Sequence, residues 1–248
     1  TVMPEIELPG HATAAMAAYP ELCCRGKEKG PKTPRPDWCI SKEVMCAGND
    51  DAIRFYEKVF DYVCELFPDS PVIHFGGDEC PKDCWKVCPK CQARIRALGL
   101  KDEDALQGWV TRHFTEYLEK KGRRAIGWDE VLDYPGVSRK TMGTCWRGPE
   151  KGQVAALAGH DVVMTPLQSC YFIFDQLLPD DPHEYAMWGG MGLPLRKVYD
   201  YDPVEGVAEA ARKHVLGAEG CCWTEYIHDT SELEHAMFPR ALALSEVL

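Results

Sequence analysis

The chain alternates short apolar runs with longer amphipathic stretches, and this alternation limits the possible folds more than any other feature of the sequence. Six runs are predicted as strands, over residues 5–8, 72–75, 124–128, 141–146, 161–165 and 217–223. Helical patterns lie between or after them, over residues 50–67, 91–98, 104–121, 150–158, 204–215 and 231–244. Strands that alternate with helices in this way are typical of an α/β fold around a parallel sheet.

Polar and aromatic residues follow nearly every predicted strand, at positions where a packed core would not place them. In chain order these residues are His11, Asp78, Glu79, Trp128, Trp146, Tyr171, Trp223 and Glu225. In a (β/α)₈ barrel the reacting groups come from the carboxyl ends of several strands, whereas a doubly wound open sheet concentrates them at one switch point. The pattern therefore predicts a TIM barrel with a single active-site mouth.

Six strands do not close an eight-stranded barrel, and the sequence opens almost directly in a strand. We therefore expect the barrel to be incomplete, with about six of eight βα units present and the first two missing. Residues 1–248 would form the C-terminal three-quarters of one catalytic barrel, with no second domain in this chain. We expect such a piece to expose strand edges, to depend on the missing N-terminal part for stability, and to be inactive alone.

The most informative stretch is residues 74–80, which reads HFGGDEC. A short apolar strand runs into two glycines, which allow close backbone approach, and then presents Asp78 and Glu79. Adjacent residues at a strand end point to different sides, so the two carboxyl groups can acquire different pKa values and different tasks. The alternative is a solvated acidic turn before a helix, where carboxylates are also favoured.

Five segments resemble, in order and spacing, successive motifs of the family 20 glycoside hydrolases, the β-N-acetylhexosaminidases. They are residues 4–11 (PEIELPGH), 74–79 (HFGGDE), 127–130 (GWDE), 146–148 (WRG) and 223–225 (WTE). The resemblance covers nearly the whole chain, from about the third barrel strand onward. It also implies that two strands, a sugar-gripping arginine and a smaller preceding α/β domain lie outside this sequence.

The resemblance implies a retaining mechanism in which the substrate supplies the nucleophile. The 2-acetamido oxygen would attack the anomeric carbon and form an oxazolinium ion, which avoids the entropy cost of a bimolecular step. Glu79 would be the general acid and then the base for water, and Asp78 would hold the acetamido N–H. Tyr171 would donate its hydroxyl to the acetamido carbonyl. This chemistry needs no metal and no other cofactor.

The resemblance also assigns contacts to the sugar. Trp128, Trp146 and Trp223 would enclose the N-acetyl methyl group and stack beneath the pyranose, the alternative being ordinary core tryptophans. Glu225 would accept hydrogen bonds from the hydroxyl groups at positions 4 and 6. His11 matches the family histidine near the general acid, unless it is a structural histidine that caps a turn. A core or loop position is predicted for the remaining tryptophans, Trp38, Trp85, Trp109 and Trp188.

One position departs from the family pattern. The family often has Tyr-x-Asp in the seventh-strand loop, where the aspartate binds sugar hydroxyls, but this chain has Ile173 two residues after Tyr171. Ile173 cannot accept a hydrogen bond, and a shift of the loop would be needed to recruit Asp175. A preference for N-acetylglucosamine, N-acetylgalactosamine or a substituted sugar is therefore not inherited.

Charge and hydropathy exclude other classes of protein. With 28 basic and 39 acidic side chains the formal charge is -11, which opposes binding to nucleic acid. No window approaches about 18 consecutive apolar residues and no leader peptide is visible, so neither a membrane span nor a signal peptide is predicted. Because members of the resembled family usually act on extracellular or lysosomal glycans, we expect an extracellular, periplasmic or lysosomal location.

Thirteen cysteines leave at least one thiol unpaired within the chain. Cys80, Cys84, Cys88 and Cys91 include one CxxC pair, which raises three possibilities: a zinc site, a disulfide from Cys84 to Cys88 or Cys91, or reduced thiols. A further bridge among the cysteines near residues 23, 24 and 46 is also open.

Together these features predict an exo-acting β-N-acetylhexosaminidase that acts on amino-sugar glycans or glycoconjugates. Two alternatives remain open at this point. One is a relative of the same barrel that binds amino sugars without hydrolysing them, which the Ile173 departure motivates. The other is a zinc-dependent module built on the cysteines from Cys80 to Cys91.

Overall fold

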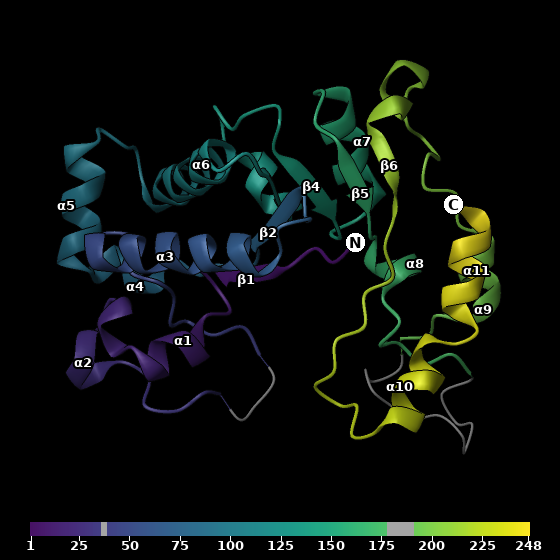
Figure 1. The fold of residues 1–248 in the computed structure, drawn as a ribbon, viewed down its shortest axis with the longest axis horizontal. Coiled ribbons are helices and arrows are strands. Elements are labelled where there is room, and N and C mark those ends of the chain that lie inside the picture. The colour runs from purple at the N-terminus through teal and green to yellow at the C-terminus, as the bar shows by residue number, and fades with distance from the viewer. Residues whose placement is uncertain (36–38, 178–190) are drawn as a thin grey trace. The chain divides into compact units, whose positions relative to one another are not determined.

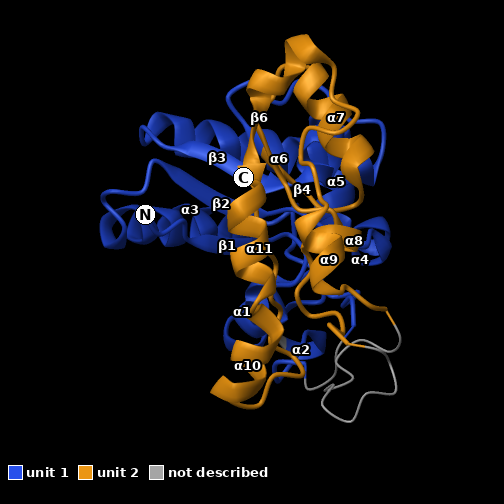
Figure 2. Ribbon diagram, turned by 90° about the vertical axis from the view of Figure 1, so that its right-hand side faces the viewer, with its two compact units in different colours: residues 1–142 blue, residues 143–248 orange. Residues whose placement is uncertain are grey.

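The computed structural model describes residues 1–35, 39–177 and 191–248 (Figure 1). The chain divides into two compact units, residues 1–142 and residues 143–248, which Figure 2 draws in different colours. Each unit combines parallel strands with helices, as the α/β prediction requires. Every helix in the described part of the chain is too short or too polar to cross a lipid bilayer.

The first unit contains three strands and the helices that connect them. The strands are β1 (Glu5–Leu8), β2 (Val72–Gly76) and β3 (Arg124–Trp128). The α-helices are α1 (Thr13–Ala18), α2 (Gly26–Lys29), α3 (Asp50–Leu66), α4 (Asp83–Val87), α5 (Pro89–Ala97) and α6 (Glu103–Lys120). Two 3₁₀ helices cover Pro20–Leu22 and Asp129–Asp133.

The second unit begins within β4 and has the same alternation. Its strands are β4 (Met142–Cys145), β5 (Val162–Met164) and β6 (Val215–Ala218). Its α-helices are α7 (Pro149–Leu157), α8 (Leu167–Cys170), α9 (Leu195–Tyr199), α10 (Thr230–Met237) and α11 (Arg240–Val247). A 3₁₀ helix covers Glu209–His214.

The strands within each unit pair in parallel, in the order in which they occur along the chain. In the first unit β1 pairs with β2, with a register shift between Glu5 and Leu8, and β2 pairs with β3. In the second unit β4 pairs with β5, and β5 pairs with β6. Parallel pairing brings the carboxyl ends of neighbouring strands to the same edge, where barrel enzymes place their reacting groups.

The two long helices of the first unit supply much of its core. Helix α3 begins where the Asn49 side chain accepts a hydrogen bond from the Asp51 N–H, and α6 begins where Asp102 accepts one from the Ala105 N–H. Phe60 of α3 packs against Phe114 of α6, with ring centroids 5.6 Å apart. The buried faces of both helices follow the spacing of three and four residues that the sequence shows.

The remaining tryptophan predictions are tested only in part. Trp85 is fully buried in the core of the first unit, and Trp109 is partly buried against it, as predicted. Trp38 and Trp188 lie outside the described residues.

Three element predictions in the second unit need correction. The last strand spans Val215–Ala218 rather than 217–223, and of the helix predicted over 204–215 only the 3₁₀ helix Glu209–His214 forms. Gly206 has a φ of +72°, a conformation that an α-helix cannot contain. The helix predicted over 231–244 is two helices, because Pro239 lacks the N–H that an uninterrupted helix would need there.

A buried arginine connects residues 172–174 with two other segments of the second unit. Arg240 is fully buried, and its guanidinium donates to backbone carbonyls of Phe172, Phe174, Leu193 and Ala236. The guanidinium carbon also lies 5.2 Å from the centroid of the Phe172 ring. A single side chain therefore satisfies acceptors from three separate segments of the second unit.

Of the three possibilities left open for Cys80, Cys84, Cys88 and Cys91, the structure agrees with reduced thiols and contradicts both the disulfide and a zinc group of these four. Cys88 and Cys91 lie together, but their neighbours are Cys24 and Cys46 rather than Cys80 and Cys84. The Cys84 thiol donates to the Lys42 carbonyl at 3.2 Å, four residues before Cys46 in the same connecting segment. All thirteen cysteines are free thiols, so Cys84 forms no disulfide with Cys88 or Cys91. The four cysteines do not share one element, because Cys80 precedes α4, Cys84 lies within it, and Cys88 and Cys91 lie at the start of the separate helix α5.

Candidate active site

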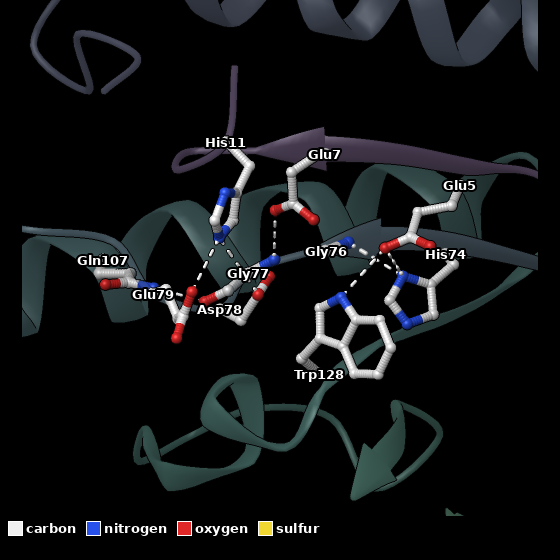
Figure 3. Close-up of polar contacts among 10 residues, drawn as sticks. All are labelled: Glu5, Glu7, His11, His74, Gly76, Gly77, Asp78, Glu79, Gln107 and Trp128. Atoms are coloured by element: carbon white, nitrogen blue, oxygen red, sulfur yellow. Dashed lines mark hydrogen bonds and ion pairs between the residues drawn. The ribbon is translucent and has the colours of Figure 1, made fainter. Parts of the chain in front are cut away.

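Three predicted site residues of the first unit lie in direct contact. His11 Nε2 lies 3.2 Å from Glu79 Oε2 and 3.4 Å from Asp78 Oδ2, so one imidazole faces both carboxyl groups (Figure 3). Asp78 is the less accessible of the two carboxyl groups, with 15% of its side chain exposed against 30% for Glu79. The pair therefore occupies two different environments, as the sequence predicts.

The backbone around these residues is unusual and brings the carboxyl groups close to β1. Gly76 has a φ of +69°, and a Cβ added there would lie 1.9 Å from Glu7 Oε1. His11 and Glu79 have φ values of 45° and 42°, in the left-handed region that residues with a side chain rarely adopt. Strained backbone of this kind clusters at functional sites, where the surrounding structure maintains it.

His11 carries a positive charge between the two carboxyl groups. Hydrogen bonds to Asp78 first and to Glu79 second raise the pKa of His11 to about 10, against the smaller opposing effect of burial. At neutral pH the imidazolium therefore acts as a hydrogen-bond donor and a fixed positive charge rather than as a base.

A second set of contacts connects β1, β2 and β3 at the same edge. Glu5 Oε1 lies 3.0 Å from His74 Nδ1 and accepts a hydrogen bond of 3.0 Å from Trp128 Nε1. The His74 and Trp128 rings meet edge to face with centroids 5.1 Å apart. Trp128 is buried and its indole is held in one orientation, beside the strand that leads to the carboxyl pair (Figure 3).

Two positioning residues were not assigned a role by the sequence analysis. Glu7 Oε1 accepts a 2.9 Å hydrogen bond from the Gly77 N–H, and Gln107 Nε2 donates a 2.8 Å bond to the Gly77 carbonyl. Burial first, and then the negative charge of Asp78, raise the pKa of Glu7 well above its usual range, which favours its neutral form. The alternation of Glu5 and Glu7 along a strand was a visible signal, but nothing in the sequence connects Gln107 to Gly77.

One carboxyl oxygen of the pair accepts no hydrogen bond from the described residues. Asp78 Oδ1 is buried, and no hydrogen-bond partner contacts it among the described residues. An unsatisfied buried acceptor costs about 1–3 kcal/mol, so its presence at a candidate active site is informative. It is a suitable acceptor for an N–H of a bound ligand.

The second unit brings together two of its predicted site residues. Tyr171 stacks on Trp146 with centroids 6.3 Å apart and on Phe174 with centroids 6.2 Å apart. Trp223 is partly exposed and Glu225 is exposed, and both follow β6 in an irregular segment. These side chains follow β4 to β6, just as the first three motifs follow β1 to β3.

The position that departs from the family pattern lies in the core of the second unit. Ile173 and Asp175 are buried, with 1% and 2% of their surfaces exposed. The backbone of Asp175 pairs with Met191 and Leu193, so this segment is fixed by main-chain hydrogen bonds.

Two groups of side chains in the described residues could hold a metal ion. One consists of His11, Asp78 and Glu79, and the other consists of Cys24, Cys46, Cys88 and Cys91. A charged imidazolium is a poor metal ligand, because ligating histidine must be neutral. The histidine and the two carboxyl groups therefore fit acid–base chemistry better than metal binding.

Comparison with known proteins decides the family. The description of the family that matches is "Glycosyl hydrolase family 20, catalytic domain", and the match covers residues 1–248. The chain belongs to glycoside hydrolase family 20. A β-hexosaminidase of Porphyromonas gingivalis is 42% identical over 248 residues, which is 100% of this chain and 31% of that protein. A β-hexosaminidase of Vibrio furnissii is 33% identical over 99% of this chain and 40% of its own length.

Solved structures of family 20 enzymes share the fold. The exo-β-N-acetylglucosaminidase of Vibrio harveyi, solved in complex with N-acetylglucosamine, matches 100% of this chain and 38% of its own chain, with a TM-score of 0.87 and 32% identity. The β-N-acetylhexosaminidase of Bacteroides fragilis matches 100% of this chain and 48% of its own, with a TM-score of 0.82 and 31% identity. The predicted fold class, an incomplete (β/α)₈ barrel, is confirmed, and the chain spans less than half of each of these relatives.

Proposed function

We propose that the protein to which this family 20 chain belongs is an exo-acting β-N-acetylhexosaminidase. It removes terminal β-linked N-acetylhexosamine from glycans and retains the anomeric configuration through a substrate-assisted step. The observation that carries the proposal is the contact of Glu79 and Asp78 with one charged histidine, while Asp78 keeps a buried oxygen available for a ligand.

Glu79 acts as the general acid and base. It is the more accessible carboxyl group of the pair, so its proton can reach the glycosidic oxygen of a bound sugar. As that oxygen leaves, the acetamido oxygen of the same sugar bonds to the anomeric carbon and forms an oxazolinium ion. Glu79 then takes a proton from the water that opens this ring and returns to its starting state.

Asp78 orients the acetamido group and stabilises its positive charge. Its buried Oδ1 accepts the acetamido N–H, an interaction that strengthens as the oxazolinium ion develops. The neutral form of Glu7 adds little repulsion beside Asp78. The family pattern assigns to Tyr171 the donation of its hydroxyl to the acetamido oxygen, and to Trp128, Trp146 and Trp223 the apolar contacts with the sugar.

His11 and Glu225 complete the assignment. The imidazolium of His11 lies 3.4 Å from Asp78 Oδ2 and 3.2 Å from Glu79 Oε2 and orients both side chains. Glu225 accepts hydrogen bonds from the hydroxyl groups of the sugar, which its exposed position permits.

The test uses the full-length protein with 4-nitrophenyl N-acetyl-β-glucosaminide and the matching galactosaminide. Release of nitrophenol, abolished by Asp78→Asn and unaffected by Glu65→Gln on the exposed surface of α3, supports the proposal. Binding of N-acetylglucosamine by calorimetry without any release from either substrate would instead identify a non-hydrolytic sugar-binding protein.

Inhibition of the same nitrophenol release tests the mechanism. A thiazoline that mimics the oxazolinium ion should inhibit the wild type competitively, and Asp78→Asn should weaken its binding by about 10²-fold. Equal inhibition of both proteins would contradict the role of Asp78.

A further inference from the structure

We propose that Cys24, Cys46, Cys88 and Cys91 bind one structural zinc ion in a tetrahedral four-thiolate site. The four sulfurs all lie within 4.8 Å of one another in the first unit. Cys46, Cys88 and Cys91 are buried, and Cys24 is partly buried. This site is separate from the carboxyl pair and has no part in the proposed hydrolysis.

The distances between the sulfurs fit one central ion. The Sγ atoms of Cys46 and Cys88, of Cys46 and Cys91, and of Cys24 and Cys91 are each 3.7 Å apart. Zinc–sulfur bonds of about 2.3 Å in a tetrahedron place each pair of sulfurs about 3.8 Å apart. A disulfide requires an S–S distance of about 2.05 Å, so none of these three pairs of sulfurs matches a covalent bridge.

The number and chemistry of the ligands also favour zinc. Four thiolates in a closed tetrahedral arrangement are a common structural zinc set, and Cys88-Pro89-Lys90-Cys91 supplies the CxxC spacing that such sites use. An iron–sulfur cluster contains inorganic sulfide between its irons and therefore needs its cysteines farther apart than one ion does. Hard cations such as Mg²⁺ and Ca²⁺ prefer oxygen ligands.

The backbone is arranged to support negative sulfurs. Cys88 is the residue that precedes the first turn of α5, whose N-terminus favours negative charge. A Cβ at Gly48 would lie 2.2 Å from the Cys91 nitrogen, so only glycine lets the segment after Cys46 approach the start of α5 closely enough to share an ion.

The ion would join three segments that are distant in sequence. Cys24 follows the first 3₁₀ helix, Cys46 leads into α3, and Cys88 and Cys91 begin α5. The segment before Cys46 reaches the active site, because the Met45 N–H donates to the Pro9 carbonyl at 2.8 Å, two residues before His11. Trp85 Nε1 also donates to the Met45 carbonyl at 2.8 Å. Zinc therefore stabilises the loops that flank the histidine and the carboxyl pair.

Loading the site converts four thiols and one Zn²⁺ into a four-thiolate complex of charge -2 and releases four protons, with no oxidation or reduction. The test begins with the full-length protein, purified without chelator, dialysed, and analysed for metals by mass spectrometry. We expect about one zinc per chain, released when a mercurial reagent titrates the thiols. Iron in place of zinc, no metal, or a disulfide among these four cysteines in a non-reduced peptide map would overturn the proposal.

Variants identify the ligands. Cys24→Ser and Cys46→Ser should each lose most of the zinc, and Cys24→Ser should melt at least about 5 °C lower. Cys84→Ser is the matched control, because this buried thiol lies near the CxxC pair but donates to Lys42 instead, and it should keep the full zinc content. Full zinc content in Cys24→Ser would refute the ligand set. If a variant does not fold, cobalt substitution of the wild type gives the answer, since the intense visible bands of a tetrahedral cobalt thiolate should appear.

Discussion

Replacing Arg240 tests whether one buried side chain organises the segment that carries Tyr171. Arg240→Met keeps a long apolar stem but removes every donor, and the carbonyls of Phe172, Phe174, Leu193 and Ala236 lose that partner. Each unsatisfied buried acceptor costs about 1 kcal/mol at the lower end of the measured range. Because methionine also removes the desolvation cost of a buried charge, we expect a net loss of about 3 kcal/mol.

Urea unfolding followed by tryptophan fluorescence measures this loss. The urea midpoint should fall by about 1 M, since the slope for proteins of this size is near the upper end of the usual range of about 1–3 kcal/mol per M. Arg196→Met is the matched control, because this arginine is exposed and pairs with Asp200 at the surface, where an ion pair contributes little. A change within about 0.5 kcal/mol for Arg240→Met would refute the reasoning.

The remaining predictions concern the catalytic group. Glu79→Gln should lower kcat/KM by about 10²–10⁴-fold for substrates with a poor leaving group, and less for an activated aryl leaving group that needs no proton; equal losses would contradict acid catalysis. His11 has a folded-state pKa of about 10, above its unfolded value, so its contribution to stability is complete below pH 6.5 and is lost as the pH rises through 10. The melting temperature of the wild type should therefore fall more across this window than that of His11→Asn, and parallel curves would exclude the ion pair. Gly76→Ala should lower both stability and activity, because its Cβ would collide with the Glu7 carboxylate; a fully active Gly76→Ala protein would show that the close approach is not required.

Local sequence signals predicted the long elements well. Helices α3 and α6 differ from the prediction by one residue at their ends, because both have a capping side chain and a continuous apolar face. Pro239 is a local signal for the break between α10 and α11, because proline cannot donate the backbone hydrogen bond of a continuous helix. The end of β6 had no such local signal. Cys221, which the prediction placed in this strand, instead forms an isolated bridge with Tyr171, a residue far from it in sequence.

The cysteines also show the difference between what local sequence signals predict and what tertiary contacts decide. The CxxC pair was visible in the sequence, and a zinc group completed by the neighbouring Cys80 and Cys84 was one of three possibilities. In the structure the Cys84 thiol donates to the Lys42 carbonyl. The sulfurs that lie near Cys88 and Cys91 are those of Cys24 and Cys46, which come from two other segments. Proximity along the chain is a poor guide to which thiols lie together, because the three segments that carry these cysteines meet only through tertiary packing.

The sequence by itself determined the α/β alternation, the family and the identity of the two adjacent carboxyl groups, since these depend on periodicity and on motifs of a few residues. Tertiary structure decided which groups surround those carboxyls: His11 between them, Glu7 and Gln107 on Gly77, and a buried oxygen of Asp78 that no hydrogen bond from the described residues reaches. The physical reason is that hydrogen-bond partners, burial and the resulting pKa shifts depend on distances between strands and helices, which no local pattern records.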